Sequence, residues 1–426
     1  MENSPIVAGA NVTKKNILFE VTTLSKTLTA VLFIILPFFG FIIGNHLASQ
    51  NVYITDTEVL QNTLQSDNLQ TAAVLASTDL SVKDQPNIGN IQTRFIVVNI
   101  AETLTHIPTA QITSASTSLS RLKQFIKKSS YGKAVVVGNV SRLYTIPAGT
   151  CNQSSYQENS NKLVQRSLEL ADADSKFTNY SHFIIYHQQP NCPDGITWTA
   201  EGYGEYKKYT INGRTIYLRG IRTSDVSDAI LFHEFGHSMG SLPEKNIGHP
   251  DYLKCKVTKT SATSTIIYIN KYCEPVFDFN SGILPIYDIM SGNQNVGLSD
   301  YGALTKSNIG WLNVNNLKQV NSKGTYKLST FETNASGTKV LALKVTASTT
   351  AYFSFRQPIK YSTITKPGVV VEVISSERYS YPAKSFLVLD DKNYQTMMVP
   401  GIIYTLGSKK VYIKSLLSGS VEVVIN

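Results

Sequence analysis

The residues with the clearest chemical potential lie in one short segment, HEFGH. His233 and His237 are four residues apart, so on an α-helix both imidazoles lie on the same side, one turn apart. Two imidazoles arranged in this way can bind one Zn²⁺ ion. Glu234, next to the first histidine, is placed to accept a proton from a water that the ion activates. The pattern predicts a hydrolytic zinc site with Glu234 as the general base.

The segment from Thr223 to Leu242 is expected to form the helix that carries this motif. Thr223 or Ser224 is a suitable N-cap, and acidic residues follow in the first turn, where they suit the helix dipole. Gly240 is expected to end the helix, because glycine readily adopts the left-handed conformation that follows a last helical turn. This helical context separates the motif from a chance occurrence of the same letters.

A zinc site needs a further protein ligand, and the sequence leaves two choices for it. Sites of the HExxHxxGxxH type have a third histidine three residues after the glycine, but here that position is Pro243, which cannot bind a metal. Glu244 follows immediately and is the alternative third ligand. His249 is the only histidine after His237, and it becomes the ligand if PEKNIG is an insertion. We expect His249 to join the two motif histidines.

The N-terminal region contains a long apolar run. No charged residue lies between Lys26 and His46, and the 19 residues from Thr27 to Asn45 would form a helix about 28 Å long, close to the roughly 30 Å hydrocarbon core of a membrane. Lysines precede the run and acidic residues follow it, which favours a cytoplasmic N-terminus. We expect a signal anchor in the cell membrane. A cleaved signal peptide, and hence a secreted protein, is the alternative.

The four cysteines all follow this run, so the expected export gives them a structural meaning. Disulfides persist in oxidising compartments. Three pairings are possible for Cys151, Cys192, Cys255 and Cys273. We favour Cys151–Cys192 and Cys255–Cys273, because each closes a moderate loop within one region. The sequence has no CxxC pair of the kind that a cysteine zinc site would need.

Composition and periodicity divide the chain into five parts. Residues 1–26 are expected to form a cytoplasmic arm, 27–48 the transmembrane helix, and 49–91 a polar stalk or linker. From 92 to 322 strand-like runs alternate with helical spacing, which predicts a mixed α/β (α+β) domain. Residues 323–426 contain about seven short strands separated by turn residues, which predicts an all-β, sandwich-like domain.

The net charge of +9 comes from scattered Lys and Arg residues rather than from a dense basic run. The sequence also lacks a nucleic-acid-binding signature, so we expect no nucleic-acid partner. With 42% hydrophobic residues, the chain is neither a disordered protein nor one with many membrane spans.

Several segments resemble, in order, the gametolysin-like metallopeptidases of the metzincin clan. The similar segments are KKSSYGKAVVVGNVSRLYTIPAGTC at the start of that family's catalytic domain, HEFGHSMGSL at its zinc helix, HPDYLKC at its His-Ala-Asn-x-Leu-x-Cys segment, EPVFDFNSGILPIYDIMSG at its Asp-x-Met turn and LSDYGALTKSNIGWL at the domain's end. The resemblance covers roughly residues 92 to 375.

The resemblance implies a metzincin-like catalytic fold, a zinc cofactor and a protein or peptide substrate. It implies that His249 is the third ligand, displaced by the insertion, and that Met290 is the Met-turn residue beneath the zinc. The departure from the family pattern is Pro243. We therefore expect a membrane-anchored, exported zinc endopeptidase. The alternative is a catalytically weakened relative that acts as a surface adhesion or binding protein.

Overall fold

The computed structural model describes residues 87–100, 108–146, 156–187, 200–240, 251–259, 265–269, 273–276, 288–290, 299–358, 366–375, 384–390 and 397–426. All of these belong to one compact unit, Leu80–Asn426. The expected cytoplasmic arm, the transmembrane helix and almost all of the stalk lie outside the described residues. Within the described residues, no helix is both long and apolar enough to cross a membrane.

The first part of this unit is a mixed α/β arrangement around a five-stranded sheet. Its strands, in spatial order, are β2 (Ala134–Ile146), β1 (Gly89–Ile100), β3 (His182–His187), β5 (Arg214–Thr223) and β4 (Glu201–Ile211). The first four are parallel, whereas β4 pairs antiparallel with β5 at the edge. The associated helices are α3 (Pro108–Ser129), α4 (Tyr156–Asp174), the short η3 (Phe177–Asn179) and α5 (Asp228–Ser238).

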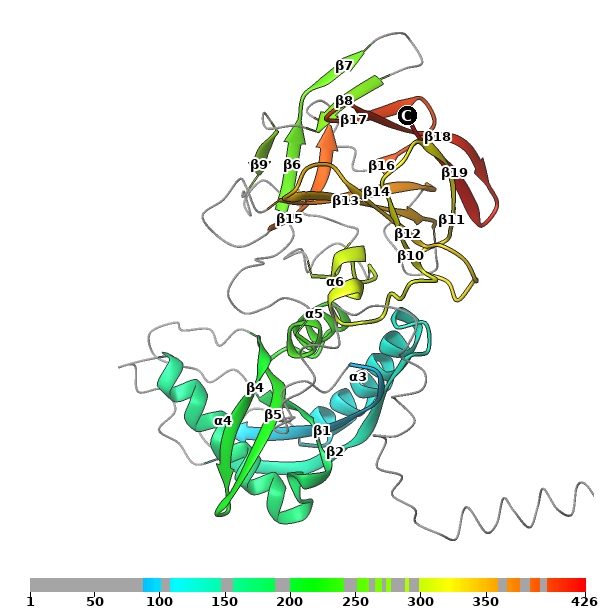
Figure 1. Ribbon diagram of the computed structural model, residues 1–426. Helices are drawn as coiled ribbons and strands as arrows, with labels where there is room; N and C mark the ends of the chain where they lie inside the picture. The colour runs from blue at the N-terminus through cyan, green and yellow to red at the C-terminus, as the bar shows by residue number, and fades with distance from the viewer. Residues whose placement is uncertain are drawn as a thin grey trace, which may run out of the picture. The chain divides into compact units, whose positions relative to one another are not determined.

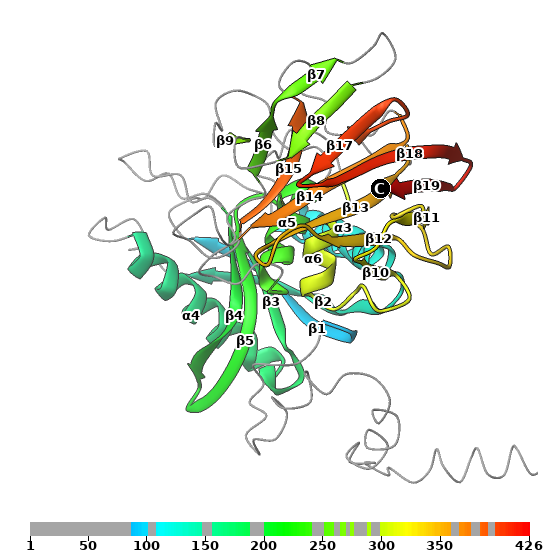
Figure 2. The same cartoon turned by 45° about the horizontal axis from the view of Figure 1, so that its top comes forward.

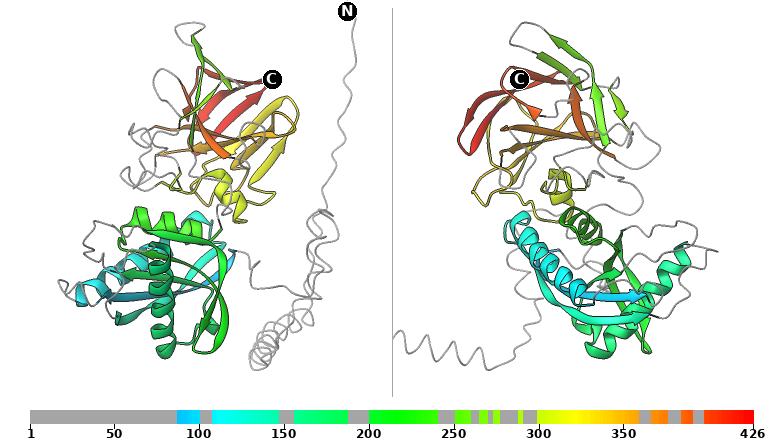
Figure 3. Two further views of the ribbon diagram at one scale, coloured as in Figure 1. Left: turned by 90° about the vertical axis from the view of Figure 1, so that its left-hand side faces the viewer. Right: turned by 180° about the vertical axis from the view of Figure 1, so that it is seen from behind.

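The interior strand β1 shows why helices cover both faces of this sheet. Its residues Phe95 and Val97 belong to the core that includes α3 and α5, whereas Ile96 and Val98 belong to the core that includes α4. A parallel strand buried on both faces needs a continuous apolar run, and FIVV supplies it. Helices α3 and α5 accordingly lie on one face and α4 on the other (Figure 1; Figure 3).

The later part of the unit contains two β-sheets. The eight-stranded sheet contains β10 (Leu317–Val320), β12 (Val340–Lys344), β13 (Thr349–Arg356), β14 (Gly368–Ser375), β15 (Lys384–Asp390), β6 (Asp251–Cys255), β9 (Glu274–Val276) and β16 (Met397–Met398). The six-stranded sheet contains β11 (Gly324–Ser329), β19 (Ser420–Ile425), β18 (Lys409–Leu417), β17 (Ile402–Leu406), β8 (Thr265–Ile269) and β7 (Val257–Lys259). Phe353 and Val371 of the first sheet share one buried core with Tyr404 and Val423 of the second, which is a sandwich-like arrangement.

The membership of these sheets differs from the expected division at residue 322. Residues 251–276 were expected in the α/β domain, yet β6 pairs in parallel with β15 and β8 pairs in parallel with β17 (Figure 2). The sequence expectation failed here because a short strand carries no local signal for a partner more than a hundred residues away; packing decides the pairing. The strands β6 to β9 therefore belong to the two C-terminal sheets.

The structure contains the expected disulfide between Cys255 and Cys273, with the two sulfur atoms 2.11 Å apart. Both cysteines are buried in the core that the two C-terminal sheets share. The other expected pair, Cys151–Cys192, lies outside the described residues. The Cys255–Cys273 bridge thus ties the end of β6 to the segment that leads into β9.

Replacing both Cys255 and Cys273 with alanine is expected to lower the free energy of unfolding by about 3 kcal/mol, because the bridge closes a loop with a sequence separation of 18 residues. Chemical denaturation of the full chain measures this change. An unchanged free energy of unfolding in the double variant would contradict this expectation.

Candidate metal centre

The helix that carries the motif begins later than the sequence suggested. Thr223 is the last residue of β5, and α5 begins at Asp228. The backbone N–H of Asp225 donates to Thr223 Oγ1 at 3.0 Å, and that of Ser227 donates to Asp225 Oδ1 at 2.7 Å. Such local side-chain bonds stabilise a turn in competition with helix. The residues expected to cap the helix thus form the turn before it.

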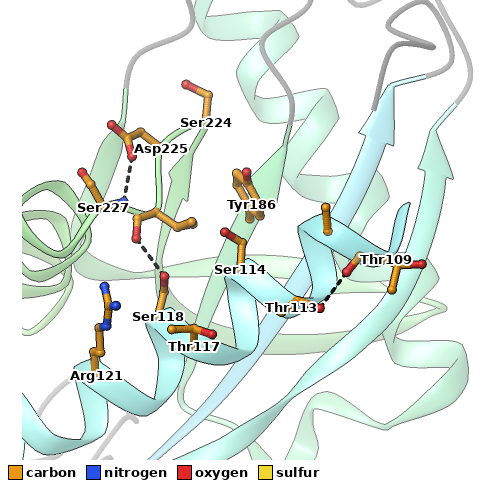
Figure 4. A pocket seen from close by; sticks show the side chains of 12 residues that line it. Thr109, Thr113, Ser114, Thr117, Ser118, Arg121, Tyr186, Ser224, Asp225 and Ser227 are labelled. Atoms are coloured by element: carbon orange, nitrogen blue, oxygen red, sulfur yellow. Dashed lines mark hydrogen bonds between the residues drawn. The ribbon is translucent and has the colours of Figure 1, made fainter. Parts of the chain in front are cut away.

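This turn and the first half of α3 line a hollow of about 680 Å³ (Figure 4). Across it, Ser118 Oγ donates to the Val226 carbonyl oxygen at 2.8 Å, which ties α3 to the start of α5. The described residues that line the hollow include none of the three motif residues. We therefore interpret its hydroxyl groups as a support for the start of α5, and place the candidate metal centre elsewhere.

The end of α5 agrees with the sequence expectation. Gly240 has a φ of +69°, in the left-handed region that favours glycine. Its N–H donates to the carbonyl oxygen of His237 at 2.8 Å, and the N–H of Met239 donates to that of Phe235 at 3.0 Å. The helix therefore ends immediately after the second histidine.

The two motif histidines meet on one face of α5. His233 is buried, and its Nδ1 bonds to the carbonyl oxygen of Ile289 at 2.8 Å. A carbonyl oxygen can only accept a hydrogen bond, so Nδ1 must carry the hydrogen atom. A neutral His233 therefore has its lone pair on Nε2. The Nε2 atoms of His233 and His237 are 3.1 Å apart. Two nitrogen ligands of one tetrahedral zinc lie about 3.3 Å apart, so this spacing fits a shared ion.

Met290 lies against the same helix. It is fully buried, and a Cβ atom built on Gly236 would be 2.4 Å from its sulfur. The ring of Tyr301 is also close to this position, 2.7 Å from the same built Cβ, and its hydroxyl donates to the Phe232 carbonyl oxygen at 2.7 Å. Glycine is therefore needed at position 236 for space. The buried, donating hydroxyl makes Tyr301 a packing residue rather than an acid facing a substrate.

Glu234, the expected general base, is buried between α5 and the edge strand β4. Burial is the largest influence and raises the pKa of its carboxyl group to about 7; a hydrogen bond from the backbone of Gly202 lowers it. A Cβ built on Gly202 would be 2.5 Å from the Glu234 carbonyl oxygen and 2.6 Å from the Cβ of His237. Because these are atoms that cannot easily move, only glycine allows β4 this close to the motif.

A buried polar network that the sequence did not reveal lies on the same side as Glu234. Arg222 of β5 is fully buried, with Nη1 3.2 Å from His187 Nε2 and Nη2 3.4 Å from Glu201 Oε2. The hydroxyl of Tyr203 donates to the same Glu201 oxygen at 3.1 Å. Among the smaller influences on Glu234, the negative charge of Glu201 raises its pKa and the positive charge of Arg222 lowers it. The network therefore influences the pKa of Glu234.

A signal for these strands was nevertheless present in the sequence. Asn212 and Gly213, between β4 and β5, both have positive φ values, 49° and 79°. An Asn-Gly pair between two β-rich runs is a strong hairpin signal, because such a turn needs positive φ at both central residues. Recognising this hairpin would have placed Gly202 and Arg222 on neighbouring strands.

The structure thus brings His233, Glu234, His237 and Met290 together. Both candidates for the third ligand, His249 and Glu244, lie outside the described residues. Among the residues that are described, no group of three His, Cys, Asp or Glu side chains is arranged to hold a metal ion.

Comparisons with protein families and with curated proteins give no match that assigns a function to this site. No protein-family model matches the chain, and no curated protein matches it either. The function proposed below therefore rests on the geometry of α5 and its neighbours, together with the sequence resemblance described above.

Proposed function

We propose that this chain is a zinc-dependent endopeptidase of the metzincin type. The observation that carries the proposal is the 3.1 Å separation of the two histidine Nε2 atoms, with Glu234 on the same helix and Met290 packed against it. The apolar N-terminal run supports an exported enzyme anchored in the cell membrane, with the N-terminus in the cytoplasm.

Each residue has a role that follows from its surroundings. Zinc, when bound, supplies a Lewis acid that activates water and polarises a peptide carbonyl. His233 and His237 would hold it through Nε2, and the bond from His233 Nδ1 to Ile289 fixes the ring and the tautomer. Glu234 accepts the proton of the attacking water and delivers it to the leaving amine. Its burial raises the pKa of the Glu234 carboxyl group to about 7, so at neutral pH the group can both accept and release a proton.

The edge strand β4 offers a way to hold a peptide substrate. It is the last strand of its sheet, and among the described residues no strand pairs with its outer edge. Unpaired backbone groups of an edge strand can pair with an extended peptide. Gly202 brings this strand into contact with Glu234 and His237, so a peptide paired there would pass close to the motif.

Zinc content tests the proposal. We expect about one zinc per chain in the full-length protein, and loss of that zinc in His233→Ala and in His237→Ala, because two ligands of a tetrahedral site remain after either change. Glu244→Ala and His249→Ala serve as each other's control. If His249→Ala loses its zinc and Glu244→Ala keeps it, His249 is the third ligand. A wild-type chain that binds no zinc would contradict the proposal and favour the weakened adhesion or binding protein.

A further inference from the structure

Two buried carboxyl groups lie close together beside the segment that contains Met290. Asp288 lies two residues before Met290, and Glu372 lies in the middle of β14; both are almost completely inaccessible to solvent. A Cβ built on Gly302 would be 2.3 Å from Asp288 Oδ2 and 2.4 Å from Glu372 Oε1. Both oxygens therefore lie beside the Cα of Gly302 and close to each other. We call Asp288 and Glu372 the acidic pair, and residues 288–290 the Met290 turn.

The other oxygen of each carboxyl group is already bound to backbone N–H groups. Glu372 Oε2 accepts from Ala303, the first residue of α6 (Ala303–Asn308), at 2.8 Å. Asp288 Oδ1 accepts from Met290 at 2.9 Å. Within the described part of the chain, Glu372 Oε1 has no hydrogen-bond partner. A buried carboxyl oxygen without a donor is costly, and two carboxylates this close cannot both remain ionised.

We propose that the acidic pair shares one proton, so that Glu372 Oε1 and Asp288 Oδ2 form a carboxyl–carboxylate hydrogen bond, and that Glu372 is thereby a positioning residue for the metal centre. The bond joins β14, in the C-terminal sheets, to the Met290 turn. The positioning role assumes that the candidate metal centre binds zinc, and so it rests on the proposed function. The shared proton does not depend on that function.

The path from the pair to the metal ligand is short. Asp288 fixes the Met290 turn through the Met290 N–H, and the N–H of Ile289 donates to the Asp300 carbonyl oxygen at 3.1 Å. These two bonds fix the orientation of the Ile289 carbonyl group, which accepts from His233 Nδ1. A shift of the turn would therefore turn the imidazole and move its Nε2 away from that of His237.

The charged groups around the acidic pair are mostly engaged with other partners. Arg356 of β13 pairs with Glu332 at 3.1 Å, and Asp300 pairs with Lys306 at 2.6 Å. Tyr352 of β13 is also close to Glu372. The positive charge of Arg356 favours ionisation of both acids but is shared with Glu332. One proton on the pair reduces the remaining negative charge.

Burial, the largest influence, and the negative charge of Asp288 together raise the pKa of Glu372 to about 7, and burial raises the pKa of Asp288 to about 6. An acid whose pKa is higher in the folded than in the unfolded chain holds more protons when folded, so folding is favoured at low pH. For Glu372 this contribution is complete below the ordinary value of 4.5 and is lost as the pH rises through about 7.

The experiment compares the wild-type full chain with Glu372→Gln and Glu372→Leu at pH 5.5 and pH 8.5. It measures stability by chemical denaturation and zinc affinity by competition with a chelator. A glutamine amide can donate to Asp288 and accept from Ala303 without titrating. We expect Glu372→Gln to be less destabilised than the wild type on going to pH 8.5 and to keep its zinc affinity. We expect Glu372→Leu to lose roughly 10- to 100-fold in zinc affinity at both pH values.

Glu422→Gln, at an accessible carboxylate of β19, is the matched control and should leave both measurements unchanged. If stability depended on pH equally in the wild type and in Glu372→Gln, the inference that the acidic pair shares a proton would be wrong. Undiminished zinc affinity in a folded Glu372→Leu would overturn the positioning role. The stability comparison needs neither zinc nor activity, so absence of zinc from the wild type would reject the proposed function alone.

Discussion

Replacing Glu234 with glutamine is expected to lower the rate of peptide hydrolysis about a thousandfold while the chain keeps its zinc. The carboxylate is the proposed proton acceptor, and an amide of the same shape cannot accept a proton from water. The fold around it should not change, because the glutamine side-chain carbonyl can still accept the hydrogen bond that Gly202 now gives to the carboxylate. Turnover of an unstructured protein substrate at saturating zinc, together with zinc content per chain, measures both effects.

The matched control for this substitution is Glu169→Gln on α4. Glu169 pairs with Arg166 at 3.0 Å on the surface of the same α/β part, so it tests the general effect of losing one carboxylate. Its hydrolysis rate should equal that of the wild type. If the Glu234 variant still cleaved peptide at the wild-type rate, the base would have to be another residue, and the mechanism proposed for this helix would be wrong.

The parts of the fold that sequence predicted well are those with strong local signals. Helices α3 and α4 show apolar side chains at helical spacing, and β1 to β3 are apolar runs that suit a sheet buried on both faces. The pair of histidines needed nothing beyond helical geometry. The mixed α/β character of the first part of the unit, from β1 to α5, followed from the alternation of these runs.

What sequence could not predict depends on contacts between distant segments. Gly202 is an ordinary strand glycine until β4 approaches α5, and only then does the absence of a side chain matter. Glu372 reads as a polar interruption of the apolar run GVVVEVIS, yet it lies fully buried against the Met290 turn. Pairing of β6 and β8 with the C-terminal sheets is equally non-local. In each case tertiary packing gives the residue its role.

These non-local contacts change how the C-terminal sheets should be regarded. A separate binding module would be expected to share few buried polar contacts with the motif-bearing part. Here Glu372 of β14 binds the start of α6 and faces Asp288, whose turn orients His233. The C-terminal sheets therefore contact the turn that orients His233, as we expect for the proposed enzyme and not for a separate binding module.

Gly202→Ala is expected to lower hydrolysis by about a hundredfold, because displacing a catalytic group by about 1 Å has an effect of that size. The new Cβ would be 2.5 Å from the Glu234 carbonyl oxygen and 2.6 Å from the Cβ of His237, and both atoms are fixed by the helix. Either β4 moves away, which removes the hydrogen bond to the Glu234 carboxylate, or α5 moves and separates the histidines. We also expect a loss of about 1–3 kcal/mol in the free energy of unfolding from overpacking.

Gly213→Ala is the matched control, because Gly213 lies in the turn of the same hairpin and nothing is within 4 Å of a Cβ built there. Its φ of +79° makes alanine cost about 1 kcal/mol of stability through the left-handed conformation, with no effect on hydrolysis or zinc content. Stability, zinc content and turnover of the two variants separate a general weakening of the hairpin from a clash at the motif. Equal loss of activity in both would show that the hairpin as a whole matters, and not the close approach of Gly202 to Glu234.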